Sequence, residues 1–386
     1  MKSQSQKPVR RYIIGLSLAC ASFFAQAEEM TFVSFGGALQ DAQRAAFLLP
    51  FSRATSNKVF EKNWDGGIDK MRMRARIGNQ DWDVVQVEGE DFVLGSSEGL
   101  FEKLDWNSLG GKERYLPQAV SDYGVGSIMY SIVLGYDQTR FAAAPKSWAD
   151  FFDIKKFPGK RALRKTAKTT LEIALLADGV KPDEVYKLLA TKEGQTRAFR
   201  KLDEIKPYIV WWESGSKPVD LLLTGKVALA AAYNGRIAAA KQKGGDKLRI
   251  QWDQNLFMMD WYVVMKNAKN PVLARQFLGY INQPEVASKL PPLIPYGVPR
   301  IDVMRAMATD AYRDLPTHPD NTQNALKIDD KFWVENGEKL ERVFGIYVQL
   351  YVSNPIGDTA PVLAAIEPKS INHGSRRTAY GETAIR

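Results

Sequence analysis

Aromatic and carboxylate side chains at the ends of expected strands are the residues of this sequence whose types could bind a small molecule. They are Phe35, Glu88, Tyr233 and Tyr296. Aromatic faces attract an ammonium group, and a desolvated carboxylate accepts its charge-assisted hydrogen bonds. In open α/β sheets, ligands bind at the carboxyl ends of the strands. The pattern therefore indicates a site for an amine, and the alternative for each aromatic residue is a place in the core or at its rim.

The motifs of the common catalytic and metal sites are missing from the sequence. It has no G-x-S-x-G elbow, no H-E-x-x-H and no P-loop, and His318 and His373 have no Glu or Cys at ligand spacing. The glycines at 36 and 37 lack the third glycine of a dinucleotide fingerprint. Acidic residues are plentiful, but no spacing singles out a catalytic pair. We therefore expect no enzyme, no cofactor and no metal, with a secreted enzyme as the distant alternative.

The first 27 residues have the pattern of a secretory signal peptide. Four basic residues precede an apolar run at 12–24, and a small-residue cleavage motif ends at Ala27. The run is shorter than the roughly 20 residues of a membrane span. We expect cleavage after Ala27, and the alternatives are an N-terminal anchor and lipidation of Cys20. Loss of the leader removes the only cysteine and lowers the net charge from +9 to +5, which argues against a nucleic-acid partner.

The rest of the chain alternates between strand and helix patterns, which predicts a largely parallel sheet with helices on its faces. We expect strands at 30–35, 83–87, 127–136, 227–233, 248–252 and 260–265. We expect helices that open at Asp41, Pro271 and Pro284, and others at 68–77, 148–152, 169–177, 182–189 and 236–243. Pro50 should end or kink the first helix. The strand at 127–136 should cross between lobes.

The length of 386 residues predicts two lobes, because single cores stop growing near about 250 to 300 residues. We expect lobe I to comprise 28–134 and 265–300, and lobe II to comprise 135–264 and 301–352. Residues 353–386 are polar and interrupted by prolines, so we expect a weakly ordered tail.

Several segments resemble the bacterial periplasmic solute-binding proteins of ABC transporters. The first are VSFGGALQDAQRAAFLLPF and DVVQV, and within that superfamily LLLTGKVALAAAYNGR, NLFMMDWYVV and IPYGVP resemble the spermidine/putrescine-binding branch. The resemblance covers about residues 30–350. It implies an α/β, type II-like fold with two lobes, each a mixed, mostly parallel sheet flanked by helices. The ligand would lie in the cleft between the lobes and be trapped by hinge closure.

The resemblance also implies individual ligand-binding residues. Phe35 matches an aromatic residue that flanks the alkyl chain of the ligand, Tyr233 replaces a stacking tryptophan, and Tyr296 matches a pocket tyrosine. Asp260 matches the carboxylate that holds a ligand ammonium. Glu88 stands where a small hydroxyl residue usually contacts the ligand, and its carboxylate could accept an amine.

Four further positions belong to the same comparison. Gly37, beside Phe35, and Trp212 complete the expected binding set, with Ser214 as the alternative contact to Trp212. Met258 stands where a second tryptophan is common in the family.

Three positions depart from the polyamine pattern. Lys165 and Thr169 stand where polyamine binders carry acids for the distal amine, and Arg236 stands where the putrescine type has an acid. The planar fork of arginine suits a carboxylate or phosphonate, and a buried arginine that faces a second ammonium would be strongly unfavourable. A zwitterionic ω-amino acid such as γ-aminobutyrate is therefore the alternative ligand. The other interpretation of Arg236 is a first-turn helix residue that points into solvent.

We therefore expect the periplasmic substrate-binding component of an ABC importer, with putrescine or spermidine as ligand and γ-aminobutyrate as the alternative. Its partners would be this small amine or amino acid and an inner-membrane permease, with no nucleic acid, and the chain would be a monomer. A metal-binding receptor usually needs paired tyrosines or histidines, and the sequence has no adjacent tyrosine pair.

Overall fold

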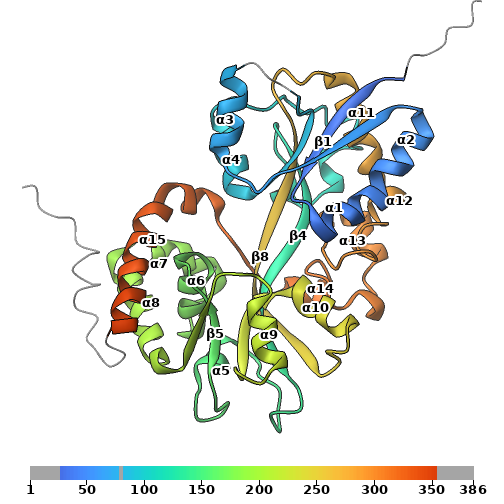
Figure 1. Ribbon diagram of the computed structural model, residues 1–386. Helices are drawn as coiled ribbons and strands as arrows, with labels where there is room; N and C mark the ends of the chain where they lie inside the picture. The colour runs from blue at the N-terminus through green and yellow to red at the C-terminus, as the bar shows by residue number, and fades with distance from the viewer. Residues whose placement is uncertain (1–26, 78–80, 354–386) are drawn as a thin grey trace, which may run out of the picture.

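A computed structural model describes residues 27–77 and 81–353. Two lobes of α/β structure lie one above the other, and a single pair of long strands runs from one lobe into the other (Figure 1). The strands of both lobes form one continuous sheet with the order β2-β1-β3-β8-β4-β7-β5-β6, and β9 pairs with β8. The expected two-lobed α/β fold is confirmed. The strands of the two lobes belong to the same sheet, with β8 and β4 at the junction.

The first lobe is built on three parallel strands, with β1 between the other two. The strands are β1 (Glu29–Ser34), β2 (Lys58–Asn63) and β3 (Val84–Val87). The surrounding helices are α1 (Gly37–Gln43), α2 (Leu49–Thr55), α3 (Ile68–Ile77), α4 (Gly89–Ser97), α11 (Pro271–Ile281) and α12 (Pro284–Ala287). All four residues of β3 are buried, as expected for a strand that is covered on both faces.

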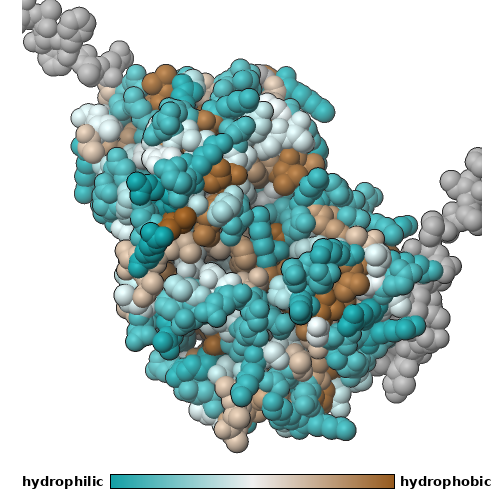
Figure 2. Space-filling view, turned by 180° about the vertical axis from the view of Figure 1, so that it is seen from behind, coloured by the Kyte–Doolittle hydropathy of each residue, from teal (hydrophilic) through white to brown (hydrophobic). Residues whose placement is uncertain are grey.

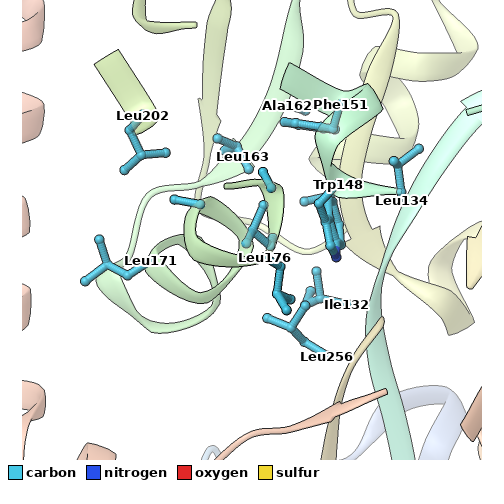
Figure 3. Close-up of a cluster of buried hydrophobic side chains, with 14 of the residues drawn as sticks. Ile132, Leu134, Trp148, Phe151, Ala162, Leu163, Leu171, Leu176, Leu202 and Leu256 are labelled. Carbon is cyan, nitrogen blue, oxygen red and sulfur yellow. The ribbon is translucent and has the colours of Figure 1, made fainter. Parts of the chain in front are cut away.

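The second lobe has its own core and its own three strands, with β5 between β6 and β7 and parallel to both. The strands are β5 (Arg161–Arg164), β6 (Ile209–Trp212) and β7 (Leu229–Tyr233). The helices are α5 (Trp148–Phe152), α6 (Ala167–Ala177), α7 (Val185–Leu189), α8 (Lys192–Asp203), α9 (Lys217–Leu223), α10 (Asn234–Gln242) and α15 (Asp330–Ser353). Figure 3 shows part of this core, where Trp148 lies among the side chains of Ile132, Leu134 and Leu176.

The connection between the lobes is formed by β4 (Val125–Asp137) and β8 (Leu248–Val264), which pair antiparallel. The sequence predicts two separate strands, 248–252 and 260–265, and this is wrong because residues 253–259 also belong to β8. The register of the pair shifts twice, between Gly126 and Met129 and between Ile132 and Leu134. Shorter elements complete the chain: β9 (Leu326–Lys327), α13 (Ile301–Ala306), α14 (Pro319–Thr322), and short 3-10 turns.

The first helical segment differs from the prediction at both ends. Helix α1 begins at Gly37 rather than at Asp41, and Pro50 does not end the helical path. A π-helical turn, η1 (Arg44–Leu48), leads directly into α2, where Pro50 lies in the first turn. Leu48 and Leu49 keep right-handed helical dihedrals, so Pro50 stands within a continuous helical path, directly after the π-helical turn.

The rear face of the molecule is mostly hydrophilic (Figure 2). Figure 2 shows the hydrophobic side chains on the rear face in small, separate patches. Within residues 27–77 and 81–353, no helix is long and apolar enough to cross a bilayer. The predicted signal peptide and most of the predicted tail lie outside the described residues.

Candidate functional site

The carboxyl ends of the second-lobe strands bring aromatic side chains together where the lobes meet. Tyr233 ends β7, and its ring lies 5.9 Å from that of Trp212, which ends β6. Tyr130, in the crossing strand β4, lies 6.1 Å from Tyr233 and 6.1 Å from Tyr296. The structure therefore joins three of the predicted residues into a row of rings and adds Tyr130, which the sequence interpretation missed.

Asp260, in β8, is a buried carboxylate with one free oxygen. Its side chain is 4% exposed, its Oδ2 accepts a hydrogen bond from Nε2 of Gln86 at 3.1 Å, and its Oδ1 is buried without a partner. Burial raises the pKa of Asp260 well above its usual range, and the nearby Glu88 raises it further, whereas Tyr130 and Gln86 act in the opposite direction. A buried carboxylate oxygen without a donor is costly, so an incoming ammonium would stabilise it.

Gln86 is positioned by a network of buried side chains. Its Oε1 accepts hydrogen bonds from Ser34 Oγ at 3.0 Å and from Gln43 Nε2 at 2.7 Å. Gln43 in turn donates to the hydroxyl of Tyr262 at 2.9 Å. This network fixes which end of the Gln86 amide faces Asp260, because the carbonyl end is already occupied.

Glu88 stands at the start of α4, directly after β3, and its side chain is exposed to solvent. Partial burial raises the pKa of Glu88, and the neighbouring carboxylates of Asp91 and Glu90 raise it further, while Lys168 and Arg164 lower it. The side chain is exposed, so water screens these charges. Burial is the main cause of the raised pKa of Tyr130, and Asp260 and Glu88 each act to raise it further.

Asn234 and Gly235, which follow β7, pack the segment that contains Tyr296 against the start of α10. Asn234 accepts a hydrogen bond from the Ser131 backbone N–H at 3.0 Å and donates to the carbonyl of Pro295 at 2.9 Å. Gly235 is required by close approach, because a Cβ there would lie 2.8 Å from Cε1 of Tyr296. This contact holds the Tyr296 ring against α10.

Arg236 lies in the first turn of α10, and its side chain is exposed. Among the described residues no carboxylate lies within 4.0 Å of its guanidinium. Both charges act on Tyr296: burial raises the pKa of Tyr296, Arg236 acts to lower it, and Asp260 acts to raise it. The two charges that the sequence interpretation pairs across a ligand therefore both act on the same tyrosine.

Phe35 and Gly37 belong to the first lobe. The Phe35 ring stacks on Trp64 at 5.9 Å, and Trp64 is held by a hydrogen bond from its Nε1 to the Gln86 carbonyl at 3.0 Å. Gly37 is exposed at the start of α1. No hydrogen bond, ion pair or ring contact of the described residues joins Phe35 or Gly37 to the row around Tyr233.

Other positions singled out in the sequence are buried or ion-paired in the second lobe. Trp212 is 2% exposed and donates from Nε1 to the Ala231 carbonyl at 3.1 Å, so it packs in the core with its edge on Tyr233. Lys165 is exposed and pairs with Glu213 at 2.7 Å. Thr169 is 1% exposed with a left-handed φ of 75°, at a break in the start of α6. Met258 is also buried, at 7% exposure.

A group of charges that the sequence interpretation missed connects the lobes beside these rings. The ammonium of Lys168, in α6, pairs with Glu90 of α4 and lies 3.7 Å from Oδ1 of Asp330, the first residue of α15. Burial lowers the pKa of Lys168, but the two carboxylates outweigh it and raise that pKa. Burial raises the pKa of Asp330 to about 6. Gly89 is needed at the contact, since a Cβ there would overlap Asp330.

Two hollows of about 720 Å³ each lie elsewhere. One is bounded by α2, α11 and the 105–110 loop, and the other by α4, the 182–187 segment and residues 325–331. Neither is lined by Asp260, Tyr233 or Arg236. In residues 27–77 and 81–353, no three His, Cys, Asp or Glu side chains are grouped to hold a metal ion. We therefore take the residues at and beside the strand ends as the candidate site and call them the strand-end group: Tyr130, Trp212, Tyr233, Arg236, Asp260 and Tyr296.

Comparisons with known proteins find solute-binding proteins among the relatives of this chain. A curated γ-aminobutyric acid-binding protein of Pseudomonas aeruginosa is 43% identical over 338 residues, which span 88% of this chain and 96% of that protein. The solved structure of a γ-aminobutyrate (GABA) receptor is 33% identical with a TM-score of 0.73, over 83% of this chain and 97% of that one.

Polyamine binders are more distant. The spermidine/putrescine-binding periplasmic protein of Escherichia coli strain K12 is 24% identical over 235 residues, which span 58% of this chain and 65% of that protein. The expected receptor class is therefore supported, while the expected polyamine branch is only a remote relative. Residues 56–319 match the family model described as bacterial extracellular solute-binding protein, and the chain belongs to this family.

Proposed function

We propose that this chain is the periplasmic substrate-binding component of an ABC importer and that its ligand is a small zwitterionic ω-amino acid such as γ-aminobutyrate. The observation that carries the proposal is that a carboxyl and a guanidinium, each without an ion-pair partner among the described residues, both act on Tyr296. Asp260 offers a buried oxygen without a donor, and Arg236 has no carboxylate within ion-pair distance among the described residues. The ammonium of the ligand would bind Asp260 and its carboxylate would bind arginine.

The relatives support the same ligand class. The relative at 43% identity is a γ-aminobutyric acid-binding protein, whereas the spermidine/putrescine binders reach 24%. Putrescine or spermidine is the second candidate, because Glu88 and Asp260 both act on the ring of Tyr130 and could hold one ammonium between them. A diamine would bring its distal ammonium towards the arginine, which makes it the weaker ligand.

The remaining parts of the proposal follow from the receptor role. The protein would capture its ligand between the lobes, deliver it to a membrane permease and leave it chemically unchanged. It would act in the periplasm as a monomer without a cofactor, after cleavage behind Ala27. Turnover of a bound amine would contradict this role.

The test is calorimetric titration of residues 28–386 with γ-aminobutyrate, putrescine and spermidine. We expect γ-aminobutyrate to bind and the Arg236→Gln variant to bind it about tenfold or more weakly, because a charge-assisted hydrogen bond contributes about 1.5 to 3 kcal/mol. The same variant should bind putrescine no more weakly than the wild type. Arg249→Gln, a change of the same type in β8 on the second lobe, is the control and should leave all affinities unchanged. Wild-type protein that binds putrescine but not γ-aminobutyrate would contradict the proposed ligand.

A further inference from the structure

Arg164 is a cation beside the strand-end group, and the sequence interpretation did not identify it. It is the last residue of β5, in register with Trp212 of β6, and its side chain is half-buried. Its guanidinium lies 5.9 Å from the ring centre of Trp212 and 5.9 Å from that of Tyr233. Both distances are within the range of cation–π attraction, so the two rings hold the guanidinium at the end of the sheet.

Arg164 has no anionic partner among the described residues. No carboxylate lies within 4.0 Å of its guanidinium, whereas its neighbour Lys165 pairs with Glu213 and Lys168 pairs with Glu90. A half-buried cation without a counter-charge is costly, and an anion that arrives with the ligand would offset that cost. Arginine is suited to this because its planar fork donates two parallel hydrogen bonds to a carboxylate.

The position of Arg164 also limits which ligand groups can stack on the ring of Tyr233. An ammonium that stacked on Tyr233 from the same side would meet the guanidinium as a like charge. Burial raises the pKa of Glu88 and that of Tyr233, and the charge of Arg164 opposes both rises. The site is therefore divided: Asp260 and Glu88 supply negative charge, and the end of β5 supplies positive charge.

We propose that Arg164 is a specificity-determining residue that binds the anionic group of the ligand and keeps a second ammonium away from Tyr233. This inference rests on the proposed function and deepens it, because it names a second guanidinium, less exposed than that of Arg236, for the same carboxylate. The ligand class it selects is an amine with one anionic end, and diamines are rejected.

The test uses three amines that each have four carbon atoms and differ only at the end opposite the shared ammonium: this end is a carboxylate, a methyl group or a second ammonium. Calorimetry of wild-type protein and Arg164→Gln should be carried out with γ-aminobutyrate, n-butylamine and putrescine. We expect the variant to bind γ-aminobutyrate about tenfold or more weakly, since it loses a charge-assisted contact. It should bind n-butylamine as the wild type does and putrescine more tightly. Lys165→Gln removes the same charge from the next, exposed position and should change none of these affinities.

Arg164→Lys is the second variant, and thermal unfolding shows which variants fold. Lysine keeps the charge but loses the fork, so γ-aminobutyrate should bind less tightly than to the wild type while n-butylamine binding is unchanged. Equal γ-aminobutyrate affinity of wild-type protein and the folded Arg164 variants would overturn the role of Arg164, as would a parallel loss of all three ligands. Wild-type protein that binds no γ-aminobutyrate would instead contradict the proposed function, and the role of Arg164 would fall with it.

Discussion

Gln86 donates its Nε2 hydrogen to Oδ2 of Asp260 at 3.1 Å, and the other carboxylate oxygen has no donor. Because the carbonyl end of Gln86 is used by Ser34 and Gln43, the amide cannot turn to offer anything else. Asp260 is thus held in place by the protein while half of its hydrogen-bonding capacity is left for a ligand.

Replacement of Asp260 by Asn should separate binding from stability. We expect γ-aminobutyrate affinity to fall by about 2 kcal/mol or more, about thirtyfold, because the ammonium loses its charge-assisted acceptor. The ligand-free protein should be as stable as the wild type or more stable at neutral pH, since burial disfavours the ionised carboxyl. Calorimetry and thermal unfolding measure the two effects. Asp246→Asn, an exposed site, is the control, and unchanged γ-aminobutyrate affinity in Asp260→Asn would contradict the assignment.

Ligand binding should release protons in the pH range where Asp260 of the ligand-free protein titrates. Burial, followed by the nearby Glu88, raises the pKa of Asp260 well above its usual range, so the ligand-free protein holds this proton to a higher pH than an ordinary carboxyl does. An ammonium at Oδ1 favours the charged form and lowers that pKa, which expels the proton. The measured binding enthalpy should therefore differ between phosphate and Tris buffers at one pH. The difference should vanish in Asp260→Asn, and identical wild-type enthalpies in the two buffers would count against the linkage.

Glu172, in α6, should give the free energy of unfolding a distinct pH dependence. Its Oε1 accepts hydrogen bonds from Trp333 at 2.7 Å and Tyr186 at 3.0 Å, its Oε2 has no partner, and burial raises its pKa to about 7. The folded state thus holds this proton more tightly than the unfolded chain. The stabilisation is complete below the unfolded pKa and is lost as the pH rises towards about 7.

Glu172→Gln should make the free energy of unfolding less dependent on pH. Between about pH 5 and about pH 7, the wild type should lose up to about 1.4 kcal/mol per pH unit through this group, and the variant should not. Urea unfolding at several pH values measures the slope. Glu204→Gln, at the exposed end of α8, is the matched control. Parallel profiles for wild type and Glu172→Gln would show that this carboxyl does not titrate in that range.

Lys168→Gln should weaken the connection between the lobes. The variant leaves Glu90 and Asp330 without their shared cation, so we expect a loss of about 1 kcal/mol, since the ammonium is only partly exposed. The loss should shrink at about 0.5 M NaCl, where screening weakens the wild-type pair. Thermal unfolding at low and high salt measures this. Lys187→Gln breaks an exposed pair with Glu184 and should have no measurable effect; equal shifts in the two variants would contradict a special role for Lys168.

The sequence predicts those features that depend on local pattern. The first strand, the strands that end at Val87 and Tyr233, and the helix that opens at Pro271 all follow from side-chain period or turn chemistry, and all are present. The break between 252 and 260 is wrong because polar residues Asp253, Gln254 and Asn255 resemble a turn. In the structure Asn255 accepts a hydrogen bond from Ser131 and donates to the Asn321 carbonyl, so β8 continues through them.

The candidate site is predictable only in part, because it is assembled from residues far apart in the chain. Tyr233, Asp260 and Tyr296 could be identified from strand ends and from the family resemblance. Arg164 and Lys168 could not, since nothing in the local sequence tells which cation of a basic stretch has a partner. Lys165 lies between them and pairs with Glu213, a choice made by the register of β5 and β6.

The order of strands in the sheet has a consequence for how the chain acquires its structure. β3 is covered on one edge by β1 and on the other by β8, with Val84 opposite Val264 and Val87 opposite Trp261. The apolar edge of β3 therefore lacks its neighbour until most of the polypeptide is available, and contacts so distant in sequence are slow to form. Until then the N-terminal part exposes an unpaired, valine-rich edge of the kind that aggregates. The sheet of the first lobe can therefore be completed only with residues 261–264, which follow most of the second lobe in the chain.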